Sequence, residues 1–180
     1  MFKKYYCLSF LIFSFSLLVT RSGFAQPAML SKGDAAPVFT TQASLAGSAF
    51  NFSLKDALAK GPVVVYFYPS AYTGGCDLEA HTFAELKDKF TAAGATIIGV
   101  SADDIQRLNS FSSDSNYCAG KFPVASDPGA GITSGLFYFD GDPYAVFVNG
   151  DGTIARIVRG AVLTPSSLTA DERALIPSGT

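Results

Sequence analysis

The sequence has few residues of the kinds that build metal sites and dithiol redox centres. Its 180 residues include three cysteines and one histidine. No Cys-x-x-Cys pair occurs, which disfavours an ordinary dithiol oxidoreductase. A copper chaperone would need two nearby cysteines and a downstream histidine, a set that is missing. The acidic pieces Asp103-Asp104 and Asp140-Gly141-Asp142 lack the spacing and closing Glu of a calcium loop. We therefore expect no metal and no cofactor.

Basic residues are also scarce in most of the chain. Residues 1–25 contain Lys3, Lys4 and Arg21 and no acidic residue. The other 155 residues hold ten basic and fifteen acidic residues, a net charge of −5. Since this part has no cluster of Lys and Arg, we do not expect it to bind nucleic acid or an anionic membrane.

The first 25 residues have the three zones of a secretory signal peptide. A basic start at Lys3-Lys4 precedes an apolar run from Tyr5 to Val19, and Gly23-Phe24-Ala25 is a small-residue cleavage site. The run is about fifteen residues long and is interrupted by serines, whereas a membrane anchor needs roughly 20. We predict cleavage after Ala25, loss of Cys7 with the signal, and export to a periplasm or to the outside of the cell.

Residues 26–180 have the length of one domain and can bury a core without cross-links. No internal repeat or linker divides them. They keep two cysteines, Cys76 and Cys118. In an oxidising compartment the simplest interpretation of such an even number is one structural disulfide.

The apolar pattern predicts an α/β domain. The run 62–68 has no polar alternation, which is typical of a central strand covered on both faces. Residues 149–152, Asn-Gly-Asp-Gly, are the strongest hairpin signal, and 26–52 suits a small hairpin at a sheet edge. Further strands are expected at 95–100, 122–125, 144–148 and 153–158. Helices are expected at 53–58, at 76–93 and from 103 to about 117, the last with Ser101 as its cap. The residues from Pro165 suit a loosely attached helix or tail. This order predicts a sheet with helices on both faces.

The stretch from Tyr66 to Ala80 carries the chemistry. The buried strand ends at Pro69, which cannot donate to a ladder, and Cys76 stands at or near the first turn of a helix. Helix N-terminal amides carry a partial positive charge that favours a thiolate. Gly74-Gly75 lets the backbone approach a small ligand and allows a positive φ, and Thr73 can donate its hydroxyl proton to an oxygen or a thiolate. Each of these features is consistent with a role for Cys76 as a nucleophile.

Pro69, Thr73 and Cys76 stand at the spacing Pro-x-x-x-Thr-x-x-Cys. In this motif the chain resembles the peroxiredoxin family, above all the branch typified by bacterioferritin comigratory proteins, from about Gly33 to Val162. The resemblance implies a thioredoxin-like fold with an added N-terminal hairpin. It also implies a thiol peroxidase for hydrogen peroxide or organic hydroperoxides, in which the Cys76 thiolate becomes a sulfenic acid. A thioredoxin-like or other thiol reductant would be its partner, and the protein would be a monomer or a homodimer.

The same resemblance leaves the second thiol to be assigned. Members of this branch often carry a resolving cysteine five residues after the reactive one, where this chain has His81. Other branches carry it in the next helix, which implies Cys118. The alternative is that Cys118 is a small buried hydrophobic residue. A Cys76–Cys118 disulfide would require the first turn at Cys76 and residues 110–120 to loosen.

Two further positions can be compared with the family pattern; one departs from it and one matches it. Family members carry an arginine at the start of the strand equivalent to 144–148, but the matching place here is near Pro143. The resemblance then implies slower peroxide reduction, or a substitute in Arg156 or Arg159. Glu79 matches the acid of the family's active-site hydrogen-bond network, or else it complements the helix dipole.

A second interpretation makes the protein a non-catalytic binding or scaffold domain of thioredoxin-like fold, with Cys76–Cys118 as a permanent disulfide. His81 lies about 140° around the helix from Cys76, so we do not expect a Cys–His hydrolase. The aromatic residues 137–139 suit either the core or a dimer surface.

Overall fold

The computed structural model describes residues 29–137 and 144–159. Several predictions fall outside the described residues: the signal peptide at 1–25, the aromatics Tyr138 and Phe139, the acidic piece 140–142, Pro143, and the tail from Pro165. Within the described ranges, no helix is both long enough and apolar enough to span a membrane.

The described strands form one seven-stranded sheet in the order β2-β1-β5-β4-β3-β6-β7. The strands are β1 Thr40–Leu45, β2 Ser48–Ser53, β3 Val63–Phe67, β4 Thr96–Ser101, β5 Val124–Ser126, β6 Tyr144–Val148 and β7 Ile154–Arg159. The helices are α1 Leu54–Leu58, α2 Gly74–Ala92 and α3 Ile105–Ser113. β4 pairs in parallel with β3 and with β5, and the other pairs are antiparallel, so the sheet is mixed. The predicted alternation of strands and helices is confirmed.

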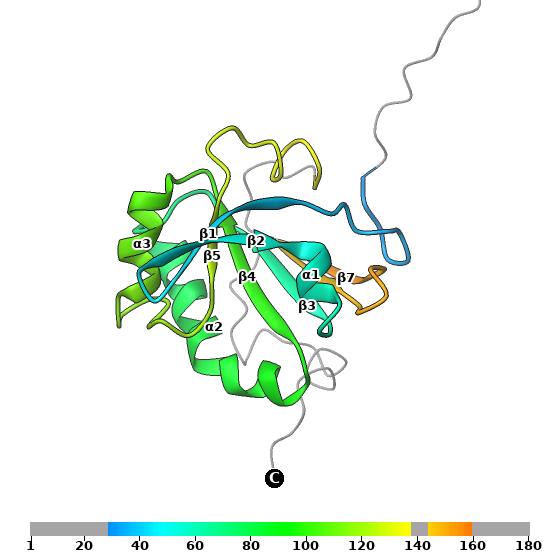
Figure 1. The fold of residues 1–180 in the computed structure, drawn as a ribbon, viewed down its shortest axis with the longest axis horizontal. Helices are drawn as coiled ribbons and strands as arrows, with labels where there is room; N and C mark the ends of the chain where they lie inside the picture. Colours follow the sequence, from blue (N-terminus) through cyan, green and yellow to red (C-terminus); the bar gives the residue numbers. More distant parts are fainter. Residues whose placement is uncertain (1–28, 138–143, 160–180) are drawn as a thin grey trace, which may run out of the picture.

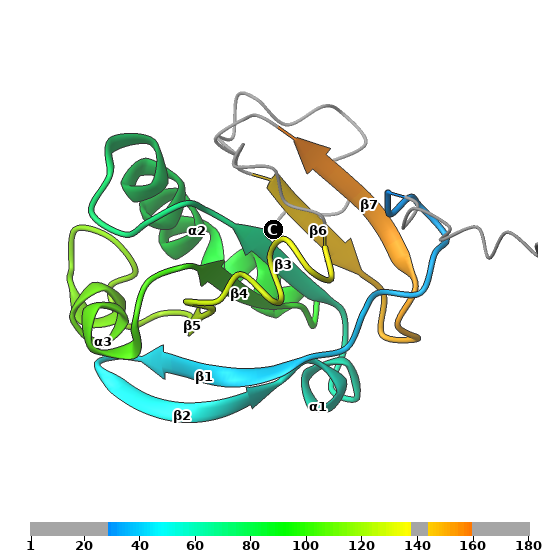
Figure 2. The ribbon, with the colours of Figure 1, turned by 90° about the horizontal axis from the view of Figure 1, so that it is seen from above.

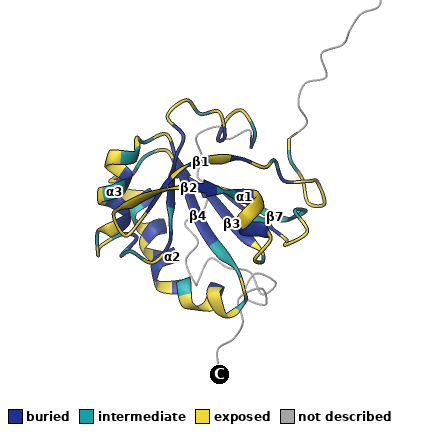
Figure 3. Ribbon diagram, in the orientation of Figure 1, coloured by how far each residue is buried: buried dark blue, intermediate teal, exposed yellow. Residues whose placement is uncertain are grey.

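Helices cover both faces of the sheet, as predicted. α2 and α3 lie on one side and α1 lies on the other (Figures 1 and 2). All five residues of β3 are buried: Val63, Val65 and Phe67 pack in the core on the α1 side, while Val64 and Tyr66 pack on the α2 side. Figure 3 shows this buried layer along the central strands. β3 is therefore the predicted central strand.

Both predicted hairpins are present. β1 and β2 pair along their full length at the edge of the sheet, with a turn at Ala46-Gly47, where both residues have positive φ. β6 and β7 flank the Asn-Gly-Asp-Gly turn, which the Asn149 N–H closes by donating to the Thr153 carbonyl at 2.9 Å. These turns fix the register of the two outer strand pairs.

The structure corrects both ends of α3. Ser101 is the last residue of β4, and the helix is capped by Asp104, whose Oδ1 accepts from the Arg107 N–H at 2.8 Å. The helix ends at Ser113, four residues before the predicted end near Tyr117, because Asp114 takes an extended backbone. Cys118 consequently lies in the turn that follows α3.

Candidate active site

Cys76 is the third residue of α2, close to the end of β3. After β3 ends, the Tyr68 N–H adds one more sheet bond to the Val100 carbonyl at 3.1 Å, and Pro69 then begins the loop into α2. The side chain of Cys76 is 6% exposed, while Pro69 and Thr73 are exposed. The loop thus brings the three residues of the motif to one end of the sheet, with the thiol just beneath the surface.

The first turn of α2 has amide groups that no side chain caps. Thr73 is the N-cap residue, but its side chain makes no cap hydrogen bond. Its Oγ1 instead donates to the Ser70 carbonyl at 2.6 Å, so in this conformation its proton is not directed at Cys76. Asp77 Oδ1 accepts from the Thr73 N–H at 3.1 Å. The first amides of the helix are free to donate to a ligand oxygen or to the sulfur.

Gly74-Gly75 would allow a positive φ if the turn demanded one, but in the structure the positive φ belongs to a different residue. Gly74 and Gly75 are the first two residues of α2 and neither has a positive φ; Tyr72, two residues earlier, has φ of 60°. A Cβ atom built at Gly74 or Gly75 would meet no atom of the described residues within 4 Å. The two glycines therefore leave open space beside the helix start, enough for a small ligand to approach the backbone.

Asp103 ties this loop to the sheet, a contact that the sequence did not indicate. It follows β4 and its side chain is 7% exposed. Its Oδ1 accepts from Ser70 Oγ at 2.8 Å, and its Oδ2 accepts from the Ala71 N–H at 2.7 Å and from Ser101 Oγ at 2.8 Å. β3 and β4 are parallel neighbours, so their carboxyl ends meet at one edge. In the sequence, the expected adjacency of these two strand ends was the only indication that Asp103 would reach this loop.

Glu79 is buried close to the same helix start. Its side chain is 1% exposed, and burial raises the pKa of its carboxyl from 4.5 to about 7. It makes no hydrogen bond or ion pair with another described residue. The first-turn acid of α2 is Asp77, and Glu79 lies in the second turn. A solvent-exposed residue that complements the helix dipole is therefore a poor description of Glu79.

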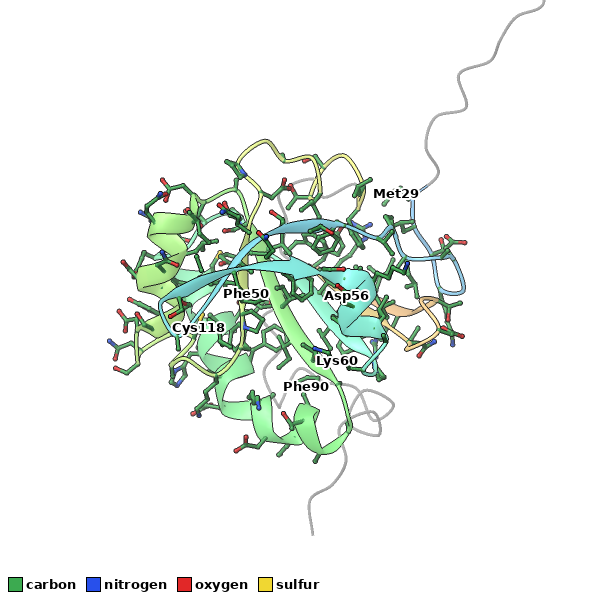
Figure 4. The ribbon with its side chains drawn as sticks, in the orientation of Figure 1. Met29, Phe50, Asp56, Lys60, Phe90 and Cys118 are labelled. Atoms are coloured by element: carbon green, nitrogen blue, oxygen red, sulfur yellow. The ribbon has the colours of Figure 1, made fainter. Side chains whose placement is uncertain are left out.

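Cys118 lies in the same apolar cluster as Cys76, on the α2 and α3 side of the sheet (Figure 4). It is fully buried, and the two thiols are not bonded to each other. Burial raises the pKa of the Cys118 thiol far above its usual range, and the nearby carboxylates of Asp114 and Asp77 raise it further. In this conformation Cys118 is a neutral thiol and a weak nucleophile.

Three aromatic rings connect the active-site loop to the turn that carries Cys118. The Tyr72 ring packs edge-on against Phe111 at 5.2 Å and against Tyr117 at 5.3 Å between centroids. Phe111 and Tyr117 stack at 5.1 Å. We call Tyr72, Phe111 and Tyr117 the aromatic cluster. Neither the loop nor the turn can move far without separating these rings.

The two arginines proposed as substitutes for the family arginine both lie on β7. Arg159 places its guanidinium over the Tyr144 ring, 5.1 Å from the centroid. Arg156 is in register with Phe147, which pairs with Val64 near the start of β3, whereas Cys76 follows the end of that strand. The strand register therefore sets Arg156 away from the Cys76 end of β3. Arg159 is in register with Tyr144, which pairs with Phe67 at that end, so its role as the substitute stays a prediction.

Two other candidates can now be placed. His81 is exposed on α2 and its Nε2 lies 3.4 Å from Glu85 Oε1, so it is a surface residue. Phe137 is buried and packs against Phe67 and Phe39, which places it in the core.

Comparison with known proteins finds one family throughout. A family model described as the AhpC/TSA family matches residues 32–157. A Mycobacterium tuberculosis protein whose name assigns it to the peroxiredoxins is 37% identical over 99 residues, 55% of this chain and 59% of its own length. Chloroplastic peroxiredoxin Q of Gentiana triflora is 44% identical over 77 residues, 43% of this chain and 34% of its own length. The chain thus spans less than two thirds of these curated relatives.

Comparison with solved structures finds a similar fold. The crystal structure of peroxidoxin BcpB from Mycobacterium tuberculosis matches with a TM-score of 0.63 and 23% identity, covering 73% of this chain and 86% of that chain. The predicted thioredoxin-like fold with an N-terminal hairpin is confirmed.

Proposed function

Because this chain belongs to the AhpC/TSA family, the peroxiredoxins, we propose that it is a thiol-dependent peroxidase with Cys76 as the reactive thiol. One observation carries the proposal. Cys76 lies in the first turn of α2, where amide groups without a side-chain cap face open space beside Gly74 and Gly75. Such a site suits a small polar substrate such as a hydroperoxide, because the amides can donate to its oxygens.

In the first step, the Cys76 thiolate attacks the terminal oxygen of the hydroperoxide. A sulfur–oxygen bond forms and the O–O bond breaks, and the electron pair leaves with the second oxygen, which takes a proton to become water or an alcohol. Cys76 is oxidised to a sulfenic acid. Since the Thr73 proton is donated to the Ser70 carbonyl, Thr73 Oγ1 offers its lone pairs to the peroxide O–H. Pro69 shields the substrate from the solvent side.

In the second step, the Cys118 sulfur bonds to Cys76 and the sulfenic oxygen leaves as water. The buried, neutral Cys118 has to be exposed first. The loop and the turn must therefore open, which separates the aromatic cluster. A thioredoxin-like or other thiol reductant then supplies two electrons, reopens the disulfide and restores both thiols.

Glu79 is proposed as part of the active-site network, although this chain has Pro143 near the place where family members carry the arginine that pairs with this acid. A carboxyl with a pKa near 7 is present in both protonation states at neutral pH, so it can exchange a proton with groups at the base of the site. We expect slower peroxide reduction than in family members that keep the arginine.

Trapping of the sulfenic acid tests the chemistry directly. In a Cys118→Ser variant, one equivalent of hydrogen peroxide should give a dimedone adduct on Cys76, found by peptide mass spectrometry. If Cys76 keeps its free thiol under these conditions, the peroxidase proposal is wrong. The result would then favour the interpretation of the protein as a non-catalytic binding or scaffold domain.

Disulfide mapping tests the role of Cys118. Wild-type protein treated with peroxide should yield a Cys76–Cys118 peptide that thioredoxin reduces readily. A glutathione adduct or a sulfinic acid on Cys76 in place of this bond would rule out Cys118 as the resolving cysteine.

Export is a separate proposal that rests on residues 1–25 alone. N-terminal sequencing of the protein from a cell envelope or culture fraction should begin at Gln26. A cytoplasmic protein that keeps its first residues would contradict export without affecting the peroxidase proposal.

A further inference from the structure

The loop before Cys76 is held by an ion pair that no motif residue contributes. Arg107 lies on α3 and its Nε is 3.1 Å from Asp103 Oδ1. Its Nη2 donates to the Ala71 carbonyl at 2.7 Å, while Asp103 accepts from the Ala71 N–H. Both main-chain polar groups of the fully buried Ala71 are thus bound by one Asp–Arg pair. We call Asp103 and Arg107 the Ala71 clamp.

The clamp extends to the residue that follows. The Arg107 guanidinium lies over the Tyr72 ring, 5.1 Å from its centroid, in a cation–π contact. Tyr72 has φ of 60°, a left-handed conformation that costs a non-glycine residue free energy and persists only where the surroundings impose it. Arg107 therefore touches both Ala71 and Tyr72, the residues at which the chain reverses.

This reversal sets the position of the motif. Thr73 follows Tyr72 directly and is the N-cap residue of α2, and Cys76 is the third residue of the helix. If Tyr72 relaxed to a negative φ, the direction of the chain into α2 would change, and the Thr73 oxygen and the first amides would shift relative to the sulfur. A displacement of about 1 Å can cost a reaction up to a hundredfold in rate.

We propose that Arg107 is a positioning residue of the peroxidase site, acting through Asp103, Ala71 and Tyr72 on the geometry of Thr73 and Cys76. The inference rests on the proposed function. Because Asp103 neutralises its charge and its contacts are to the backbone and a ring, Arg107 sets geometry. It does not replace the direct contact of the family arginine with the thiolate.

The test compares two reactions of the same thiol. In fully reduced, full-length protein, quenched-flow mass spectrometry follows loss of the Cys76 thiol to hydrogen peroxide and, separately, to iodoacetamide. Peroxide needs the Thr73 oxygen and the amides in place, whereas iodoacetamide needs only an accessible thiolate. The ratio of the peroxide rate constant to the iodoacetamide rate constant therefore reports on positioning. A general loosening of the fold would expose the thiol and raise the iodoacetamide rate constant, so a lower ratio counts as lost positioning only where the iodoacetamide rate constant stays at its wild-type value.

For Arg107→Ala we expect this ratio to fall about tenfold. Arg107→Lys should recover only part of the loss, because one ammonium group cannot bridge Asp103 and the Ala71 carbonyl as a guanidinium does. The matched control is Lys89→Ala, which removes the same charge from an exposed position in the last turn of α2 and should leave the ratio unchanged. Thermal unfolding verifies that each variant is folded.

The two possible failures are distinct. If wild-type Cys76 reacts rapidly with peroxide and Arg107→Ala keeps the wild-type ratio within about twofold, the clamp proposal is overturned and the peroxidase proposal stands. If neither wild-type protein nor Lys89→Ala reacts with peroxide, the proposed function fails, and the positioning role fails with it.

Discussion

Glu79 makes the stability of the protein depend on pH. Its carboxyl has a pKa of about 7 in the folded protein and about 4.5 when exposed. Between these values the folded protein holds a proton that the unfolded chain releases, so the free energy of unfolding falls as pH rises from about 5 to about 8. A shift of this size corresponds to roughly 3 kcal/mol.

Replacing Glu79 by Gln should remove this loss. Glu79→Gln keeps the shape of the side chain without the charge, so its free energy of unfolding should exceed that of the wild type at pH 8 and match it more closely at pH 5. Urea unfolding at both pH values measures the difference. The exposed Asp88→Asn on the same helix is the control and should follow the wild type. Parallel curves for wild type and Glu79→Gln would contradict the account.

At the residue scale, the sequence predicts what is local. Pro69, Thr73 and Cys76 stand at a fixed spacing within eight residues, and the structure brings them together at the start of α2. Asp103 and Arg107 act on the same loop from more than thirty residues away. Their role depends on which strands are neighbours, and no spacing in the sequence encodes that.

At the element scale, the aromatic cluster links the active-site loop to the turn after α3. Replacing Tyr117 by Ala removes the ring that packs edge-on against Tyr72 and stacks on Phe111. Such ring pairs contribute about 0.5–1.5 kcal/mol each. Tyr117→Ala should therefore ease opening and form the Cys76–Cys118 disulfide several-fold faster after peroxide addition, at some cost in stability.

Quenched-flow alkylation with mass spectrometry measures this step. Tyr117→Phe keeps the ring and serves as the control, with a rate of disulfide formation close to that of the wild type. Equal rates for Tyr117→Ala and the wild type would show that opening does not separate the aromatic cluster.

The contact between β3 and β4 depends on a glycine. A Cβ atom at Gly99 would lie 2.7 Å from Cζ and Oη of Tyr66, a fully buried ring that stacks on Phe83 and cannot move aside easily. Gly99→Ala should lower the free energy of unfolding by about 1–3 kcal/mol. Chemical unfolding compares it with Gly129→Ala, where no atom lies within 4 Å of the added group. A Gly99→Ala protein as stable as this control would contradict the packing described.

The end of α3 shows why an element boundary escaped prediction. Ile105, Leu108 and Phe111 at spacings of three predict the helix but not its end. Asp114 turns the chain out of the helix, and its side chain accepts from the Asn116 N–H. The Gly120 N–H then closes the turn on the Ser112 carbonyl. These bonds compete with the helix locally, and hydrophobic periodicity does not report them.

At the scale of the whole molecule, the sequence predicts the order of elements and not the order of strands. The buried run of β3 identifies a central strand, and the turn signals locate both hairpins. That β1 lies between β2 and β5, while β6 lies beside β3, follows from tertiary packing. This arrangement gathers the ends of β3 and β4, the start of α2 and the turn with Cys118 into the proposed site.

The central claim is that Cys76 performs peroxide reduction in this fold. The most direct test is the steady-state consumption of hydrogen peroxide with a dithiol donor, for wild-type protein and for Cys76→Ser at equal concentration. The account predicts turnover by the wild type and a rate for Cys76→Ser no greater than that of the donor alone. Turnover that survives in Cys76→Ser, or is missing from the fully reduced wild type, would contradict it.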